Sequence, residues 1–194
     1  DDNANEIGYK LILLYELTIK DTFDYLNFQE IEQVAKMIDQ SSVVDIYTHS
    51  HNLNPAENFQ DKMLTVGKMI NIPKTKYKQR LTVLASDSRH VAIILSYSGK
   101  ATFIKQVIRP LYETNIPIIL ISQAGRNYYP EFIKYSIALS DKESMQDRIS
   151  QFSSHIAMQY VLDVIYATFF NLNRPKNMEY IRRYINYMDD RQLD

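Results

Sequence analysis

The chain has 194 residues, with 22 Lys and Arg against 23 Asp and Glu, and it contains no cysteine. A formal charge of −1 argues against nucleic-acid binding by these residues, because a phosphate backbone is bound by a clear excess of cations. The lack of cysteine excludes disulfides and cysteine-bound zinc, and no apolar run reaches the ~20 residues of a membrane helix. We therefore expect a cytoplasmic globular protein without membrane contact. Because the first residue is Asp rather than Met, we also expect the sequence to be part of a longer chain.

Two amphipathic helices are predicted at the start of the chain. Apolar residues recur at helical spacing over residues 7–25, and Leu26 closes this stripe. Asn27 is a plausible break between the two helices. Residues 29–39 continue as the second helix, with four residues facing inward: Ile31, Val34, Ala35 and Ile38.

Five short apolar runs follow, and helical segments separate them. The runs cover residues 43–46, 68–73, 91–95, 116–122 and 135–139, and their β-branched residues are typical of buried strands. One helix is predicted between Pro55 and Gly67, and one over residues 76–85 with Tyr77, Leu81 and Leu84 along one side. Further helices are predicted over residues 102–113 and 145–170, with a helical tail beyond Pro175.

The order of these elements predicts an α/β fold. Strands that are continuous apolar runs are buried on both faces, so the five strands should form a parallel sheet in a three-layer αβα sandwich. Ligands of such sheets bind beyond the carboxyl ends of the strands, near the point where the strand order reverses. The helix over residues 145–170 is apolar nearly all round, so the sheet should cover one side of it and the first helices or a second subunit the other.

A hydroxyl-rich turn lies between the third strand and the helix that follows it. Ser96 and Ser98 can donate hydrogen bonds, Gly99 allows close approach of the backbone, and Lys100 adds a charge. A helix that begins at Thr102 would also direct unpaired N–H groups and a partial positive charge at the turn. These features favour a phosphate group as ligand. A purely structural interpretation stays open, because serine and glycine commonly form turns and Thr102 can simply cap its helix.

The sequence "LSYSGKAT", preceded by "SDSRHVAII", resembles the signature loop of the SIS (sugar isomerase) domain, roughly Ser-x-Ser-Gly-x-Thr after a buried strand. The segments "NLNPAENFQDKMLTVGK" and "RISQFSSHIAMQYVLDVIYATFF" are similar to the first and last helices of that domain. "IEQVAKMIDQSSVVDIYTH" resembles the lead-in to the SIS domain of RpiR-type bacterial transcription regulators. The resemblance implies a flavodoxin-like sheet and three regions: packing helices over residues 1–40, the SIS domain over 41–172 and a helical tail over 173–194.

The resemblance also implies a ligand-binding set. Ser96 and Ser98 match phosphate-contacting serines, Gly99 matches the glycine of the loop, and the complete expected set is Ser96, Tyr97, Ser98, Gly99, Lys100, Thr102, Ser50 and Asn52. Two departures stand out. The threonine of the pattern falls on Ala101, and the second loop of the family, usually Gly-x-Gly-x-Ser, falls on residues 48–52, where both glycines are lost and the serine becomes Asn52.

The function implied is a sugar-phosphate sensor and dimerisation domain of a regulator of carbohydrate metabolism, with DNA bound only through a missing N-terminal helix-turn-helix domain. The alternatives are an aldose–ketose phosphate isomerase with His155 or Glu57 as base, and a domain that only dimerises. We expect no catalytic residue, no cofactor and no metal. His49 and His51 would point the same way at the end of a strand, but further metal ligands such as Asp45 or His90 are not indicated by their spacing.

Overall fold

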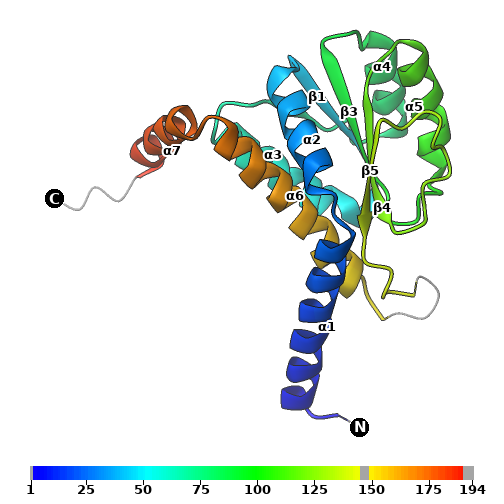
Figure 1. Cartoon of the computed structure of the whole chain (residues 1–194), viewed down its shortest axis with the longest axis vertical. Coiled ribbons are helices and arrows are strands. Elements are labelled where there is room, and N and C mark those ends of the chain that lie inside the picture. The colour runs from blue at the N-terminus through cyan, green and yellow to red at the C-terminus, as the bar shows by residue number, and fades with distance from the viewer. Residues whose placement is uncertain (1, 145–148, 190–194) are drawn as a thin grey trace.

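The computed structural model describes residues 2–144 and 149–189. Five parallel strands form its sheet in the order β2-β1-β3-β4-β5 (Figure 1). The strands are β1 (Val43–Tyr47), β2 (Ile70–Asn71), β3 (His90–Leu95), β4 (Ile118–Gln123) and β5 (Tyr135–Leu139). This order is that of flavodoxin-like sheets, so the predicted fold class is confirmed.

Seven α-helices and a short 3-10 helix, η1 (Ser50–Asn52), are present in the described residues. The α-helices are α1 (Ala4–Tyr25), α2 (Phe28–Gln40), α3 (Leu53–Leu64), α4 (Lys76–Ala85), α5 (Thr102–Glu113), α6 (Phe152–Leu172) and α7 (Arg174–Met188). The helix predicted over residues 145–170 is wrong at its start. Residues 145–148 lie outside the described residues, and 149–151 are not helical, because the Glu143 carboxylate accepts the Ser154 N–H and anchors the beginning of α6 there.

Helices cover both faces of the sheet, as the continuous apolar strands predict. Along β3, Val91, Ile93 and Leu95 belong to one core, into which α2, α3 and α6 pack. Ala92 and Ile94 belong to a second core on the opposite face, closed by α4 and α5. Both faces of each central strand are therefore buried. The four inward residues predicted for α2 are all buried there: Ile31, Val34, Ala35 and Ile38.

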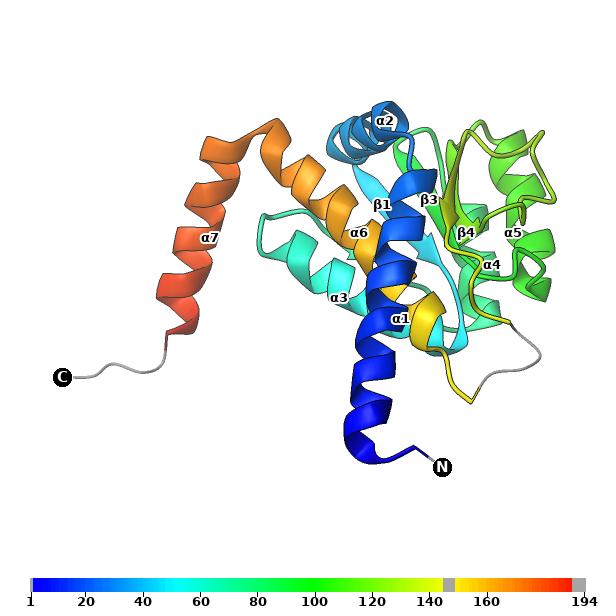
Figure 2. The ribbon, with the colours of Figure 1, turned by 60° about the horizontal axis from the view of Figure 1, so that its bottom comes forward.

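Two helices extend away from this sandwich (Figure 2). The second half of α1 packs against α6 and β5, where Thr18 and Thr22 are its buried residues, while its first half projects past the carboxyl ends of the strands. The α7 helix turns away from the end of α6 on the other side of the molecule (Figure 1). Within the described ranges, no helix is both long and apolar enough to cross a bilayer.

The α4 helix has the predicted bounds, but the side marked by Tyr77, Leu81 and Leu84 is exposed to solvent. Its buried residues are Gln79 and Val83. The Gln79 side chain donates a hydrogen bond to the carbonyl of Thr48 at 2.7 Å, just beyond β1. A tertiary hydrogen bond therefore sets the orientation of this helix on the sheet.

Candidate functional site

The sheet reverses its strand order between β1 and β3, and two loops meet at the carboxyl ends of these strands. We call residues 96–101, between β3 and α5, the serine loop, and residues 48–52, between β1 and α3, the histidine loop. The Thr48 hydroxyl of the histidine loop donates a hydrogen bond of 3.0 Å to the carbonyl of Leu95, the last residue of β3 before the serine loop. The His49 ring also makes an edge contact with the ring of Phe103, in the first turn of α5, at 5.0 Å between ring centres. The predicted site residues therefore come from two adjacent loops at the expected edge of the sheet.

The serine loop is held to β4 by its backbone. The Ser96 N–H donates to the Ile121 carbonyl at 3.1 Å, and the Gln123 N–H donates to the Tyr97 carbonyl at 3.0 Å. Within the loop, the Gly99 N–H donates to the Ser96 carbonyl at 3.0 Å. Ser96 and Tyr97 are buried, whereas Ser98 is partly exposed.

Gly99 is required for the shape of this loop. Its φ is +65°, a left-handed value that other residues adopt at a cost, and a Cβ built on it would lie 1.9 Å from the carbonyl oxygen of Arg126. The sequence predicts that glycine here allows the backbone to approach a ligand. In the structure, the backbone that approaches Gly99 is that of the loop following β4.

The start of α5 lies directly after the serine loop. Its N-cap residue is Ala101, which makes no side-chain capping hydrogen bond, and Thr102 is the first helical residue, as predicted. The first N–H groups of a helix have no acceptor within the helix, and they carry its partial positive charge. The departure from the threonine of the family pattern therefore leaves this helix end without a side-chain cap.

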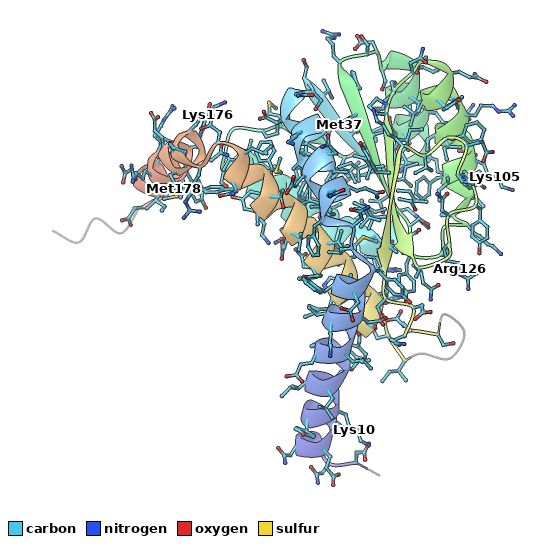
Figure 3. All side chains as sticks on the ribbon, viewed as in Figure 1. Lys10, Met37, Lys105, Arg126, Lys176 and Met178 are labelled. Carbon is cyan, nitrogen blue, oxygen red and sulfur yellow. The ribbon has the colours of Figure 1, made fainter. Side chains whose placement is uncertain are left out.

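Two cations, one of them not predicted from the sequence, lie at the same edge. The Lys100 ammonium is 4.7 Å from the centre of the Tyr128 ring, and an Arg126 guanidinium nitrogen donates to the Tyr128 hydroxyl at 2.7 Å. Figure 3 shows Arg126 at the carboxyl ends of the strands. The hydrogen bond from Arg126, with the nearby charges, lowers the pKa of Tyr128. The available signal was the segment "AGRNYY" directly after the fourth strand, because loops after neighbouring parallel strands share one edge.

The histidine loop contains no glycine, but one of its residues has the left-handed backbone conformation that glycine favours. Ser50, which stands at the second glycine of the family pattern, has a φ of +58°. Asn52, at the serine of that pattern, is buried at the start of α3. Partial burial, followed by the charge of Lys76, lowers the pKa of His49 and favours its neutral form.

Tyr97 has a structural contact that the sequence did not indicate. Its ring is buried, and its hydroxyl donates to the Ser140 carbonyl at 2.9 Å, beyond the end of β5. Its side chain thus ties the serine loop to the segment that follows β5.

The two bases considered for an isomerase are not brought together by a contact. His155 is exposed in the first turn of α6, and the Glu57 carboxylate forms an ion pair with Lys74 at 2.6 Å. The sequence predicts that the side chains of His49 and His51 point the same way, as on a strand. In the histidine loop, however, His49 has extended backbone and His51 lies in η1 after the turn at Ser50.

No cluster of three His, Cys, Asp or Glu side chains suited to a metal occurs in the described part of the chain. Asp45 and His90, the further ligands weighed from the sequence, contact each other at 2.6 Å across β1 and β3. Asn71 donates to the same carboxylate.

The fold of this chain is shared with solved sugar isomerase domains. No family model matches the chain. An uncharacterised HTH-type transcriptional regulator of Haemophilus influenzae is 21% identical over 166 residues, which make up 86% of this chain and 57% of that protein. The chain thus spans less than two thirds of the length of this curated relative.

Solved structures extend the comparison. The Vibrio vulnificus NanR protein complexed with ManNAc-6P has a TM-score of 0.87 at 10% identity, covering 98% of this chain and 72% of that one. The sugar isomerase domain of an RpiR transcription factor from Sphaerobacter thermophilus has a TM-score of 0.80 at 9% identity, covering 92% and 98%. Phosphoheptose isomerase GmhA from Neisseria gonorrhoeae has a TM-score of 0.65 at 9% identity, covering 85% and 99%. A transcription factor and an enzyme therefore both have this fold.

Proposed function

We propose that this chain is the sugar-phosphate-binding effector and dimerisation domain of a bacterial RpiR-type regulator of carbohydrate metabolism. The observation that carries the proposal is the start of α5, which has no side-chain cap and follows a serine loop with Lys100 and Arg126 beside it. A phosphate dianion fits this arrangement of N–H groups, hydroxyls and cations. The likeness to NanR complexed with ManNAc-6P supports the same class of ligand.

The proposed binding set divides into three roles. Ser98 and Lys100 of the serine loop and Thr102 at the start of α5 are accessible, and we assign them contact with the phosphate. Ser96, Tyr97 and Gly99 hold the shape of that loop, and Ser50 and Asn52 border the sugar side from the histidine loop. In the complete regulator, DNA recognition belongs to an N-terminal helix-turn-helix domain outside residues 1–194, and the protein acts in the cytoplasm as a homodimer.

The effector acts through a difference in affinity. A ligand shifts a regulator between its DNA-binding states only as far as it binds one state more tightly than the other. The alternative, an aldose–ketose phosphate isomerase, is favoured by neighbours such as phosphoheptose isomerase. The ion pair of Glu57 with Lys74 and the exposure of His155 weigh against it.

Thermal shift with a panel of sugar phosphates tests the proposal. N-acetylmannosamine 6-phosphate, glucosamine 6-phosphate and arabinose 5-phosphate are compared with the same sugars without phosphate. A ligand at 100 times its Kd stabilises the folded state by about 2.7 kcal/mol. The melting temperature should therefore rise with at least one of the phosphorylated sugars and with none of the sugars that lack phosphate.

Ser98→Ala should then weaken that binding roughly 10- to 100-fold, since a hydrogen bond to a charged group is lost. Ser88→Ala, an exposed serine before β3, is the matched control and should bind normally. No response to the panel, or unchanged affinity in Ser98→Ala, contradicts the proposed site. Exchange of the sugar α-proton with solvent, lost in Glu57→Gln or His155→Gln, would favour the isomerase.

A further inference from the structure

Two cations from neighbouring loops meet on the side chain of Tyr128, which is 39% exposed. The Lys100 ammonium of the serine loop lies 4.7 Å from the centre of the Tyr128 ring, and an Arg126 guanidinium nitrogen donates to the Tyr128 hydroxyl at 2.7 Å. The hydrogen bond from Arg126, followed by the charges of Arg126 and Lys100, lowers the pKa of Tyr128, so both cations act on the same phenol. Like charges gathered on one side chain repel each other, and an anion that binds both removes this repulsion.

No carboxylate among the described residues neutralises these two cations. The ion pairs in that part of the chain join other side chains, and neither Lys100 nor Arg126 takes part in one. The side chains that hold Arg126 are neutral, since they are the phenol of Tyr128 and the carboxamide of Gln123. The positive charge at this place is therefore available to an external anion.

Arg126 is held in one orientation by two hydrogen bonds. Its Nε donates to Gln123 Oε1 at 3.2 Å, and Gln123 Nε2 donates in turn to the Asp141 carbonyl at 3.4 Å, which fixes the direction of this buried carboxamide. Together with the bond to Tyr128, these contacts use two of the five guanidinium N–H donors and leave three without an acceptor among the described residues. A guanidinium in a fixed plane suits a phosphate, whose oxygens accept two parallel hydrogen bonds from it. The remaining donors of Arg126 are therefore preset for such a group.

The two cations border the serine loop at the carboxyl edge of the sheet, where Figure 3 shows Arg126. A Cβ on Gly99 would lie 1.9 Å from the Arg126 carbonyl oxygen, so the backbones of the two loops are in contact. Lys100 directly follows Gly99, and its N–H donates to the Ser98 hydroxyl at 3.2 Å. The α5 helix begins two residues later, at Thr102. A phosphate at the start of α5 would therefore have both cations on the side of the loop that follows β4.

We propose that Arg126 binds the phosphate of the ligand together with Lys100, and that Tyr128 is a positioning residue that holds both cations for it. The inference rests on the proposed function and adds a contact to the same site. It also assigns the charge selectivity of that site. Two cations favour a phosphate monoester, which is a dianion at pH 8, over a sulfate ester of the same shape with a single negative charge. Because Arg126 is already held in place, less conformational entropy is lost when the anion binds.

NMR titration of the chain with methyl phosphate and methyl sulfate at pH 8 tests this selectivity. The parent should bind methyl phosphate roughly tenfold more tightly, and Arg126→Gln should lower that ratio several-fold. Arg109→Gln, an exposed arginine on α5, changes the net charge equally and should keep the ratio. Because Arg126 contacts Gly99 through its backbone carbonyl, Arg126→Gln should keep the melting temperature that the parent has without ligand. An unchanged ratio in Arg126→Gln would overturn the inference.

Tyr128→Phe tests the positioning role. This variant keeps the ring beside Lys100 and removes the hydroxyl that accepts from Arg126, so methyl phosphate should bind roughly three- to tenfold more weakly. In the Arg126→Gln background the same change should have almost no effect, which a purely structural role of Tyr128 would not produce. Tyr187→Phe, a tyrosine of α7 that is 89% exposed, is the matched control and should bind as the parent does. Equal effects of Tyr128→Phe in both backgrounds would show that Tyr128 does not act through Arg126.

The outcomes distinguish this inference from the proposed function. If Ser98→Ala weakens the binding of methyl phosphate and Arg126→Gln does not, the phosphate site stands and Arg126 is not part of it. A parent chain that does not bind methyl phosphate overturns the inference, and the sugar-phosphate panel then decides the proposed function separately. Weaker binding in both variants, with a lower preference for phosphate only in Arg126→Gln, supports both.

Discussion

Two residues in left-handed backbone conformation frame the candidate site. Gly99 and Ser50 have φ values of +65° and +58° on neighbouring loops. The sequence alone suggests that replacing the second family glycine by Ser50 alters the histidine loop. The backbone at Ser50 nevertheless keeps a left-handed conformation, at a strain of about 1–2 kcal/mol for a residue with a Cβ. The loop's backbone shape is thus compatible with a side chain at this position.

We expect Gly99→Ala to be much more destabilising than Gly125→Ala. Both glycines have positive φ, so both variants carry the left-handed cost of about 1–2 kcal/mol. Only at Gly99 would the new Cβ also collide with the Arg126 carbonyl, whereas nothing lies within 4 Å at Gly125. The collision should add about 1–3 kcal/mol to the loss of unfolding free energy. Urea denaturation measures both variants, and equal losses would contradict this close approach.

At the scale of elements, the helices that begin near the carboxyl edge of the sheet differ in how they start. The N-terminus of α6 is occupied by Glu143, whose carboxylate accepts the Ser154 N–H at 2.8 Å and the Ser154 hydroxyl at 2.7 Å. The N-terminus of α5 has no side-chain cap. The start of α6 is thus capped by a carboxylate of the chain itself, whereas α3 and α5 begin without a side-chain cap, and α5 is the helix at which we propose the phosphate.

Glu143→Ala should therefore destabilise the fold by about 1–2 kcal/mol, because the start of α6 loses a buried carboxylate cap. Glu143→Gln keeps a hydrogen-bond acceptor and should cost less. Thermal unfolding compares the two, and Glu179→Ala on the exposed side of α7 serves as control. If Glu143→Ala is as stable as the control, the cap contributes nothing to the stability of the fold.

Across the whole molecule, a chain of buried hydrogen bonds joins the serine loop to α1. The Tyr97 hydroxyl donates to the Ser140 carbonyl, and the Ser140 N–H donates to the Thr22 hydroxyl at 3.1 Å. Thr22 in turn donates to the Thr18 carbonyl, and the Thr18 hydroxyl meets that of Ser153 on α6. Through these contacts, the proposed ligand loop and α1 share one polar network.

A double-mutant cycle of Tyr97→Phe and Thr22→Val measures this connection. Each variant leaves a buried group of Ser140 without its partner and should cost about 1–2 kcal/mol. Because both act on one peptide segment, their effects should deviate from additivity by at least about 0.5 kcal/mol. Thr114→Val, whose hydroxyl bonds only to the end of α5, should be additive with Tyr97→Phe. Full additivity of Tyr97 and Thr22 would mean that the loop and the helix are energetically independent.

Much of the fold is predictable from local pattern. The alternation of apolar runs with helical periods predicts the five parallel strands, and the bounds of α4 and α5 match the prediction to the residue. A strand that is buried on both faces requires a continuous apolar run, and a helix that is buried on one face requires an apolar stripe at helical spacing. The local sequence therefore indicates which segments are strands and which are helices. The serine loop is predictable for the same reason, since it directly follows the central strand β3.

The tertiary structure alone decides which distant groups meet. Four contacts join residues from separate elements. They are the approach of the Arg126 carbonyl to Gly99, the Glu143 cap on α6, the Gln79 hydrogen bond that orients α4, and the pairing of Asp45 with His90. No periodicity records such contacts, because they depend on the order and twist of the assembled strands. The sequence by itself determined the layers and the parallel sheet, and it placed the serine loop at the carboxyl edge, where we propose that a ligand binds. Only the packed chain determined which helix starts receive a cap from a distant residue, as α6 does from Glu143, since such a cap is a contact made in three dimensions.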